Sequence, residues 1–539
     1  MRLRFPIFAA LVLLVAPLAA RAQDAPAVVV RLKSVDGLLS DAKYLAKLAG
    51  QEEALKQAEE MIKTFTTEEG LGGIDTKRPF ALYGTFAEDV EKSALVALVP
   101  IANEKAFVDF LGNFMIEAKK GDDGVYSIEN VPNLPVPVYF RFANKYAYVC
   151  AMDKAHIAKD KMLAPEKVLP AAGDDAIASV NLNIAKVPDL IKQLGLGQLE
   201  AKLSELKDEK LPNETEATKK LKVAAVELFL KRLQMLLTDG EELSLRLAIN
   251  QKKDDISLDL SGTPKSGSEM AKIVKGVGET TSLYAGIADP NGALNFSARI
   301  SLPDEIKKLL GPAVDDLVKQ AIESEKAEGR NFLKAFLEKL APTLKSGEYD
   351  LGVGLRGPNA EQHYTVVGVL GLTKGKELES FVKTIVSILP EKDAKKIEVD
   401  AASAGDIKIH KIVVGDELPP EQKKVFGSDS VYIAFRDDAM FVTFGADGLK
   451  LIKEIVTAQA KAGPAVSIQA SLSRIAPLME AKDRPSLKLV EDVFGKNLQG
   501  TDTFSLKIEG GAKASLQLSL KGKLIEFAVK AQEAKGENK

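Results

Sequence analysis

Apolar residues fall on every second position in four stretches of the chain, and each stretch runs directly into a helical pattern. The stretches are 28–32, 179–184, 294–300 and 466–472. Strict alternation is typical of a strand with one apolar and one polar face. Proline or an acidic residue opens several of the helical patterns, where the first backbone N–H groups have no partner within the helix. The pattern therefore predicts four copies of a strand that leads into a helix.

A hairpin with the same alternation follows each of these segments. In the second copy Leu243, Leu245, Leu247 and Ile249 face one way, Ser244, Arg246 and Asn250 face the other, and Ile256, Leu258 and Leu260 continue the pattern across the turn. The fourth copy repeats it in residues 504–508 and 516–520, and hairpins over 80–99 and 349–372 are expected in the first and third copies. This pattern predicts antiparallel sheet with one packed and one polar face.

The first and third copies share an extension that the others lack. It consists of a helix, predicted over 104–118 and 376–389, and of further strands that include 138–152 and 431–444. Segments 95–111 and 366–382 align without a gap. We therefore expect an internal duplication with two related α+β lobes, 23–280 and 281–539, each built from two related units.

Amphipathic helices are expected to cover the apolar face of the sheet. Residues 55–65 and 221–233 carry apolar side chains at helical spacing with Lys and Glu between them. Asn213, with Glu216 three residues on, is the predicted cap of the second of these helices. Helices with one apolar stripe on sheets with one apolar face define the α+β class.

This organisation resembles uncharacterised exported bacterial proteins with duplicated α+β units. The likeness is carried by residues 30–39 and their three echoes along the chain. It is a resemblance of architecture over most of the mature chain, and it implies no activity.

The N-terminus has the pattern of a secretory signal peptide. Arg2 and Arg4 precede an apolar run over 5–18, and Ala20 and Ala22 supply the small residues that a signal peptidase reads. We predict a signal peptide over 1–22, cleaved after Ala22, and a soluble periplasmic or extracellular product. No later segment is long and apolar enough to span a bilayer. The single cysteine, Cys150, excludes a disulfide within the chain.

Composition narrows the function classes further. The chain has 539 residues, of which 46% are apolar, and 73 basic residues nearly balance 76 acidic ones. A single core stops growing at about 250–300 residues, so more than one domain is expected. The balanced charge argues against a nucleic-acid partner, which would require a basic patch.

The histidines, the cysteine and the glycine motif of this chain do not predict a metal, catalytic or cofactor site. His156, His363 and His410 stand far apart in sequence, so no metal site or catalytic base is predicted from them. His410 shares the Lys408 side of its strand and is expected to face solvent, whereas Cys150 is expected to be a small buried residue. Residues 352–357 match the dinucleotide-binding fingerprint, but another strand follows instead of the required helix.

Three short segments occur in the order of the signature elements of serine β-lactamases and penicillin-binding proteins. They are 40–43, 179–181 and 265–267. The resemblance covers ten residues, and residues 179–181 fall in a predicted strand, which does not fit that family. No catalytic residue is therefore assigned.

These observations support three functional hypotheses. The first is a non-enzymatic exported scaffold or binding protein, since no nucleophile, base and orienting group converge in the pattern. The second is a carrier of a lipid or another hydrophobic ligand, held between sheet and helices. The third is an envelope hydrolase that uses Ser40. No catalytic, metal-binding or cofactor-binding residue and no cofactor are predicted, and the partner is an unknown protein or a hydrophobic ligand.

Overall fold

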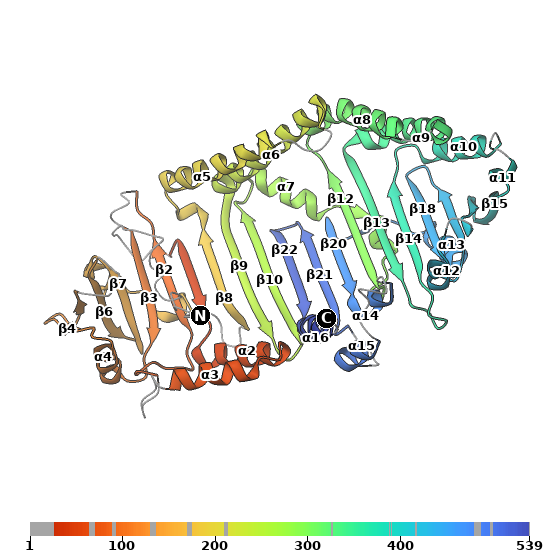
Figure 1. Ribbon diagram of the computed structural model, residues 1–539. Helices are drawn as coiled ribbons and strands as arrows, with labels where there is room; N and C mark the ends of the chain where they lie inside the picture. The colour runs from red at the N-terminus through yellow and green to blue at the C-terminus, as the bar shows by residue number, and fades with distance from the viewer. Residues whose placement is uncertain are drawn as a thin grey trace. The chain divides into compact units, whose positions relative to one another are not determined.

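The computed structural model describes residues 26–537 except 64–70, 89–92, 130–135, 170–174, 210–213, 325–326, 388, 390, 416–417, 479–486 and 496–499. The fold is α+β with a large antiparallel sheet (Figure 1). The chain forms two compact units, one of Met1–Gln198, Met235–Met270 and Ala528–Lys539, the other of Leu199–Gln234 and Ala271–Phe527. The predicted signal peptide, 1–22, and the predicted cap Asn213 lie outside the described residues.

The strands of the first unit form one antiparallel array. They are β1 (Val28–Leu32), β2 (Phe80–Thr85), β3 (Ala94–Pro100), β4 (Lys119–Lys120), β5 (Tyr126–Ile128), β6 (Val138–Ala143), β7 (Tyr146–Ala151), β8 (Ala176–Asn183), β9 (Gly240–Asn250) and β10 (Asp255–Pro264). Successive pairings give the order β4-β5-β6-β7-β3-β2-β1-β8-β9-β10. The strand β1, which the sequence marks as the first copy, therefore pairs with β8, the second.

Helices connect these strands. They are α2 (Val35–Leu48), α3 (Glu52–Lys63), α4 (Glu104–Asn113), the short η1 (Lys154–Ile157), η2 (Pro165–Lys167) and η3 (Ile184–Lys186), then α5 (Asp189–Asp208), α6 (Glu216–Asp239) and α7 (Glu269–Gly278). Figure 1 shows α2 and α3 at one end of the strands and the first part of α5 at the other. The helix α4 ends at Asn113, earlier than the predicted 118, and Met115 just beyond it has a positive φ of 59°.

The second unit contains a corresponding array. Its strands are β12 (Leu294–Ser301), β13 (Glu348–Arg356), β14 (Thr365–Gly371), β15 (Ile397–Ala404), β16 (Ile407–Val413), β17 (Ser430–Phe435), β18 (Ala439–Gly445), β20 (Val466–Ser471), β21 (Thr503–Glu509) and β22 (Ala514–Lys521). Their order is β15-β16-β17-β18-β14-β13-β12-β20-β21-β22, all antiparallel. A separate ribbon pairs β11 (Thr281–Ser282) with β19 (Lys461–Ala462).

The helices of this unit again lie between strands or follow them. They are η4 (Tyr284–Gly286), α8 (Asp304–Ser324), α9 (Ala327–Ser346), α10 (Gly375–Val386), α11 (Glu391–Ala394), α12 (Pro420–Phe426), α13 (Gly448–Ile455), α14 (Leu472–Ile475), η6 (Ala476–Leu478), α15 (Leu487–Phe494) and α16 (Lys523–Glu537). The last of them, α16, runs from the second unit into the first. No helix within the described ranges has both the length and the apolar character needed to cross a bilayer.

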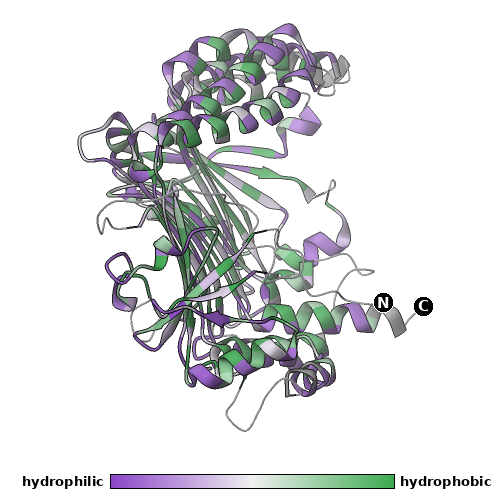
Figure 2. Ribbon diagram, turned by 90° about the vertical axis from the view of Figure 1, so that its left-hand side faces the viewer, coloured by the Kyte–Doolittle hydropathy of each residue, from purple (hydrophilic) through white to green (hydrophobic). Residues whose placement is uncertain are grey.

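All four predicted strands and the four predicted hairpins are confirmed. The hairpins are β2-β3, β9-β10, β13-β14 and β21-β22. Figure 2 shows apolar and polar residues alternating along the strands. Each predicted strand is followed by helices and then by a second strand. This second strand pairs antiparallel with the first one.

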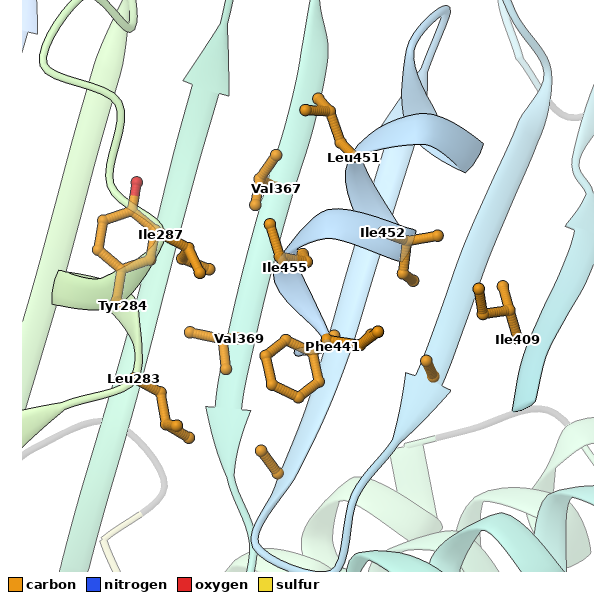
Figure 3. Packing of buried hydrophobic residues seen from close by; sticks show 13 residues of the cluster. Leu283, Tyr284, Ile287, Val367, Val369, Ile409, Phe441, Leu451, Ile452 and Ile455 are labelled. Atoms are coloured by element: carbon orange, nitrogen blue, oxygen red, sulfur yellow. The ribbon is translucent and has the colours of Figure 1, made fainter. Parts of the chain in front are cut away.

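Helix α13 covers one face of the second unit's sheet. Figure 3 shows its side chains Leu451, Ile452 and Ile455 directed toward Val367, Val369 and Phe441 on the strands. In the first unit, one face of the sheet carries a core of Val29, Tyr83, Val96, Leu98 and Tyr148, packed against Ile157, Leu163 and Val168. Ordinary burial of apolar side chains therefore supplies the core of each unit.

The second predicted amphipathic helix, α6, starts with a threonine pair. The backbone N–H of Thr218 donates to Thr215 Oγ1 at 3.2 Å, and the N–H of Thr215 donates to Thr218 Oγ1 at 2.8 Å. This reciprocal arrangement satisfies two N–H groups at the helix start, as a capping box does. Thr215 and Thr218 therefore cap the start of α6.

Candidate functional site

An apolar row crosses the sheet of the first unit at one level. Its members occupy paired positions on adjacent strands from β2 to β10. They are Leu82, Val30, Val180, Leu245 and Leu260. Because neighbouring strands lie about 4.8 Å apart, the row spans roughly 19 Å. All of these side chains project from the same face, so the sheet presents a continuous aliphatic stripe.

The stripe is exposed at β9 and β10. Leu245 and Leu260 pair directly and are 41% and 39% exposed, and the adjacent pair Leu247 and Leu258 is 38% and 36% exposed. We call these four residues the leucine ladder. On the same strand and face, Ile249 is only 3% exposed. The prediction that this face is fully packed is therefore wrong at the ladder, because the helices of the unit cover the strand ends and leave the middle partly open.

The opposite face of these strands carries a polar network. Asn181 donates to Glu242 Oε1 at 2.7 Å and to Ser244 Oγ at 3.1 Å, and Arg31 donates to Asn181 Oδ1. Arg246 forms an ion pair with Asp175. On β1 and β2 the same face carries the buried core residues Val29 and Tyr83, so it is polar only from β8 to β10. At β9 and β10 the sheet therefore has a polar face on one side and the aliphatic ladder on the other.

Helices border the ladder face at both ends of the strands. At one end Gly262 follows the ladder on β10, and a Cβ atom there would lie 3.8 Å from Leu236 Cδ1 of α6 and 4.0 Å from Met270 Cε of α7. At the other end the β9-β10 turn is held to α2, since Gln251 donates to Asp41 at 2.8 Å and Tyr44 donates to Asp254 at 2.6 Å. The ladder therefore lies between helical borders.

The chemistry of the ladder is purely hydrophobic. Its four side chains carry no hydrogen-bonding group and no charge. Each leaves about two-fifths of its surface in water, so covering each one is worth roughly 1 kcal/mol. Such a face holds aliphatic material without directional contacts.

The β-lactamase-like segments do not come together as a reaction centre. Ser40 Oγ accepts a hydrogen bond from Gln251 at 3.1 Å, while Lys43 pairs with Glu59 at 2.7 Å instead of with Ser40. Lys265 donates to the carbonyl of Thr238 at 2.6 Å, and Asn181 belongs to the polar network described above. Each element has separate partners, so this arrangement offers no activated serine.

His410 is buried, and the expectation that it faces solvent is wrong. It is 2% exposed because α10 covers this part of β16, and the register of β15 shifts between Glu398 and Ala402. The shift brings Asp400, with a positive φ of 56°, beside the imidazole ring. A bulge of this kind redirects side chains, and strand alternation alone cannot reveal it.

The ring of His410 is fully partnered. Its Nδ1 atom accepts from the backbone N–H of Asp400 at 3.1 Å, and Nε2 lies 3.2 Å from Glu379 Oε1. The ligand-type atoms of Glu379, Asp400 and His410 lie within 4.8 Å of one another, which is compatible with a metal site. However, the Lys383 ammonium contacts both carboxylates at 2.9 Å and already supplies the positive charge between them.

These contacts set the protonation states of the cluster. Burial lowers the pKa of His410 below its usual value, against the opposing effect of Glu379. The hydrogen bond from Lys383 lowers the pKa of Asp400. Burial acts to lower the pKa of Lys383, but its hydrogen bonds to Asp400 and Glu379 outweigh burial and raise it. The cluster is therefore a neutral imidazole beside a paired ammonium, which ties α10 to β15 and β16.

The glycines of the dinucleotide-like motif have a packing role. They leave room on β13 for the ring of Tyr284, because a Cβ atom at Gly352 would come 2.1 Å from Tyr284 Cγ and one at Gly354 would come 2.3 Å from its hydroxyl. The Tyr284 hydroxyl donates to Asn295 Oδ1 at 2.8 Å. A protein side chain thus fills the space above these glycines.

The remaining candidates lie apart. Cys150 is buried on β7, as predicted, and burial raises the pKa of its thiol to about 12. His156 is buried in η1, and burial lowers its pKa. In the second unit, His363 Nδ1 lies 3.4 Å from Glu361 Oε2. Comparisons with protein-family models, with curated proteins and with solved structures gave no match to this chain.

Proposed function

We propose that this protein binds the aliphatic chain of a lipid or fatty acid on the leucine ladder. The observation that carries the proposal is the paired exposure of Leu245 with Leu260 and of Leu247 with Leu258, on a face whose reverse side is polar. Water-exposed aliphatic surface costs free energy, so a face of this kind is suited to a ligand that covers it.

The composition of the ladder favours an acyl chain over a protein partner. Protein interfaces depend on aromatic and arginine anchors that fill pockets, and the ladder contains neither. The helical borders near Gly262 and at the β9-β10 turn suit a thin, flexible occupant better than a second sheet, which packs about 10 Å away face to face. The alternative of a general scaffold surface is supported only by the extended sheet.

We further propose that the two units arose by duplication, as the sequence pattern suggested. Their strand orders correspond position by position, from β4 and β15 at one end to β10 and β22 at the other. In each unit, the seventh and eighth strands of the array are an antiparallel pair of the marked strands, β1 with β8 and β12 with β20. Export by the signal peptide over 1–22 would place this lipid-binding function in the cell envelope.

The test combines extraction with a matched pair of variants. The protein is purified without detergent, extracted with organic solvent and analysed by mass spectrometry, and co-purified lipid or fatty acid is expected. Titration with cis-parinaric acid then compares Leu258→Lys with Ser257→Lys, its neighbour on the polar face. We expect at least a tenfold loss of affinity for the first and little change for the second. No lipid in the extract together with no cis-parinarate binding would reject the proposal.

A further inference from the structure

We propose that a cleft in the second unit binds a small molecule with both a carboxylate and an ammonium group, namely a free amino acid with a short aliphatic side chain. The cleft has a volume of about 260 Å³ and is partly open to solvent. Its walls are the loop 286–290, the end of β13 at Arg356, and the end of α13 with Ala458 beyond it. Pockets for drug-sized ligands have about 300–1,000 Å³, so this cleft suits a smaller ligand. The proposal is independent of the leucine ladder.

Arg356 places in the cleft a positive charge that the protein does not neutralise. Its side chain is half-buried, and Nη2 donates to the Ile287 carbonyl at 2.6 Å. Among the residues that the structure describes, no carboxylate forms an ion pair with Arg356 and no other acceptor takes its remaining N–H groups. A guanidinium has five N–H donors in a planar fork that matches the two oxygens of a carboxylate. Arg356 is therefore suited to a carboxylate ligand.

Two carboxylates line the same cleft and determine what else the ligand carries. They belong to Asp289 on the loop and to Glu454 on α13. Within the described part of the chain neither forms an ion pair, although Asp289 Oδ1 accepts a hydrogen bond from the N–H of Asn291 at 2.9 Å. A simple anion at Arg356 would be repelled by both carboxylates, whereas an ammonium group on the ligand is attracted by them. The charges of the cleft therefore favour a zwitterion over a simple anion.

Apolar side chains complete the lining of the cleft. Ile287 and Ile455 belong to the core cluster in Figure 3, and Ala458 packs against that cluster. Ala288 and Pro290 add apolar surface on the loop. None of these side chains offers a hydrogen-bonding group, so the uncharged part of the ligand is expected to be aliphatic.

The loop wall is held in place by the protein itself. The Asp289 carbonyl accepts from Asn295 Nδ2 at 2.7 Å and from the N–H of Gly292 at 2.9 Å. At Gly286 the loop lies against the chain that follows α13, because a Cβ atom there would come 2.3 Å from the carbonyl oxygen of Gln459. A wall that is already ordered loses little conformational entropy when a ligand binds, so this preorganisation favours binding of a small molecule.

Isothermal titration calorimetry with matched ligands tests the charge pattern. L-Alanine and L-leucine are titrated first, and at least one of them is expected to bind. For the amino acid that binds, the matching carboxylate is propionate or 4-methylpentanoate, which lacks the ammonium group. The matching amine is ethylamine or 3-methylbutylamine, which lacks the carboxylate. We expect each analogue to bind at least tenfold more weakly than its amino acid, because it leaves one kind of charge in the cleft without a partner.

Substitutions then locate the site. Arg356→Gln should weaken binding of the amino acid at least tenfold, whereas Arg356→Lys keeps the charge but loses the planar fork and should lose less. Asp289→Asn keeps an acceptor for the Asn291 N–H and removes one negative charge. It should weaken binding of the amino acid but not of the carboxylate analogue. Lys453→Gln is the control, since Lys453 is exposed beside Glu454 and does not line the cleft, and it should bind like the natural protein.

Three results would overturn the proposal. If neither L-alanine nor L-leucine binds the natural protein at millimolar concentrations, the cleft is not an amino-acid site. Unchanged binding in Arg356→Gln that is folded by circular dichroism would place the ligand elsewhere. Equal binding of the amino acid and its carboxylate analogue would reject the role of Asp289 and Glu454. If Arg356→Gln does not fold, unchanged binding in both Arg356→Lys and Asp289→Asn overturns the proposal instead. None of these results bears on the leucine ladder, whose probe is cis-parinaric acid.

Discussion

The ring of Tyr284 lies against the backbone of Gly352, so closely that a Cβ atom at Gly352 would be 2.1 Å from Tyr284 Cγ. Tyr284 is 3% exposed and is held by its hydrogen bond to Asn295, so the ring has little room to move. We expect Gly352→Ala to lower the free energy of unfolding by about 1–3 kcal/mol, as overpacking does. Urea denaturation followed by circular dichroism measures the change.

The control for this substitution is Gly276→Ala in α7. A Cβ atom at Gly276 meets nothing within 4 Å, and alanine is favoured over glycine in a helix by about 1 kcal/mol. It should be neutral or stabilising. Equal stability of Gly352→Ala and the natural protein would show that Tyr284 does not depend on the glycine.

The leucine ladder should contribute less to the free energy of unfolding than a fully buried row of leucines would. Leu245→Thr removes apolar surface that is already partly in water, so we expect a cost below about 1 kcal/mol. Ile249→Thr, on the same face of the same strand but buried, should cost about 2–4 kcal/mol. Thermal denaturation of the ligand-free protein compares them. A cost for Leu245→Thr as large as that for Ile249→Thr would mean that the ladder is packed in solution.

Acid should destabilise the protein through its buried imidazoles. The pKa of His410 is lowered in the folded state, where Glu379 and Lys383 of α10, Asp400 of β15 and the Phe435 ring surround it. The unfolded chain therefore binds a proton more readily, and stability is lost as pH falls below the ordinary value of 6.5.

The variant His410→Gln tests this pH dependence. Glutamine offers an acceptor and a donor but does not titrate. We expect its melting temperature to fall less than that of the natural protein between pH 7.5 and 5. Some loss should remain, because burial also lowers the pKa of His156. An identical pH profile for the two proteins would exclude His410 as a source of acid sensitivity.

Cys150 should be chemically silent in the folded protein. It is 3% exposed, and burial raises its pKa to about 12, so almost no thiolate forms at pH 8. Ellman's reagent is expected to label less than a tenth of the thiol within an hour, and one thiol per chain after addition of guanidinium chloride. Rapid labelling of the native protein would show that β7 opens readily.

The strands could be predicted from the sequence, because alternating apolar and polar residues show which side chains share one face of a strand. The pairs Leu245 with Leu260 and Leu506 with Leu518 belong to hairpins whose two arms are close in sequence. The pairing of β1 with β8 was not predicted. Its partners lie about 150 positions apart, and local alternation contains no information on which strands become neighbours.

Only part of the candidate site could be predicted from the sequence. Alternation marked the ladder leucines as one face, but it could not tell an open face from a packed one, because exposure depends on where distant helices settle. The burial of His410 was missed for a related reason: its cover comes from Glu379 and Lys383 on another element, and the bulge at Asp400 breaks the simple alternation rule. The role of Gly352 likewise required the position of Tyr284.

Each helical connection leads from one strand to the strand that pairs beside it. The length of such a connection can therefore vary. Between β8 and β9 the chain makes helices of 20 and 24 residues, whereas between β20 and β21 the described helices α14 and α15 have 4 and 8 residues. Both connections start and finish at the same end of an antiparallel strand pair, so their length leaves the pairing intact. These two connections, with those between β1 and β2 and between β12 and β13, are the natural places to graft a reporter domain or to shorten the polypeptide.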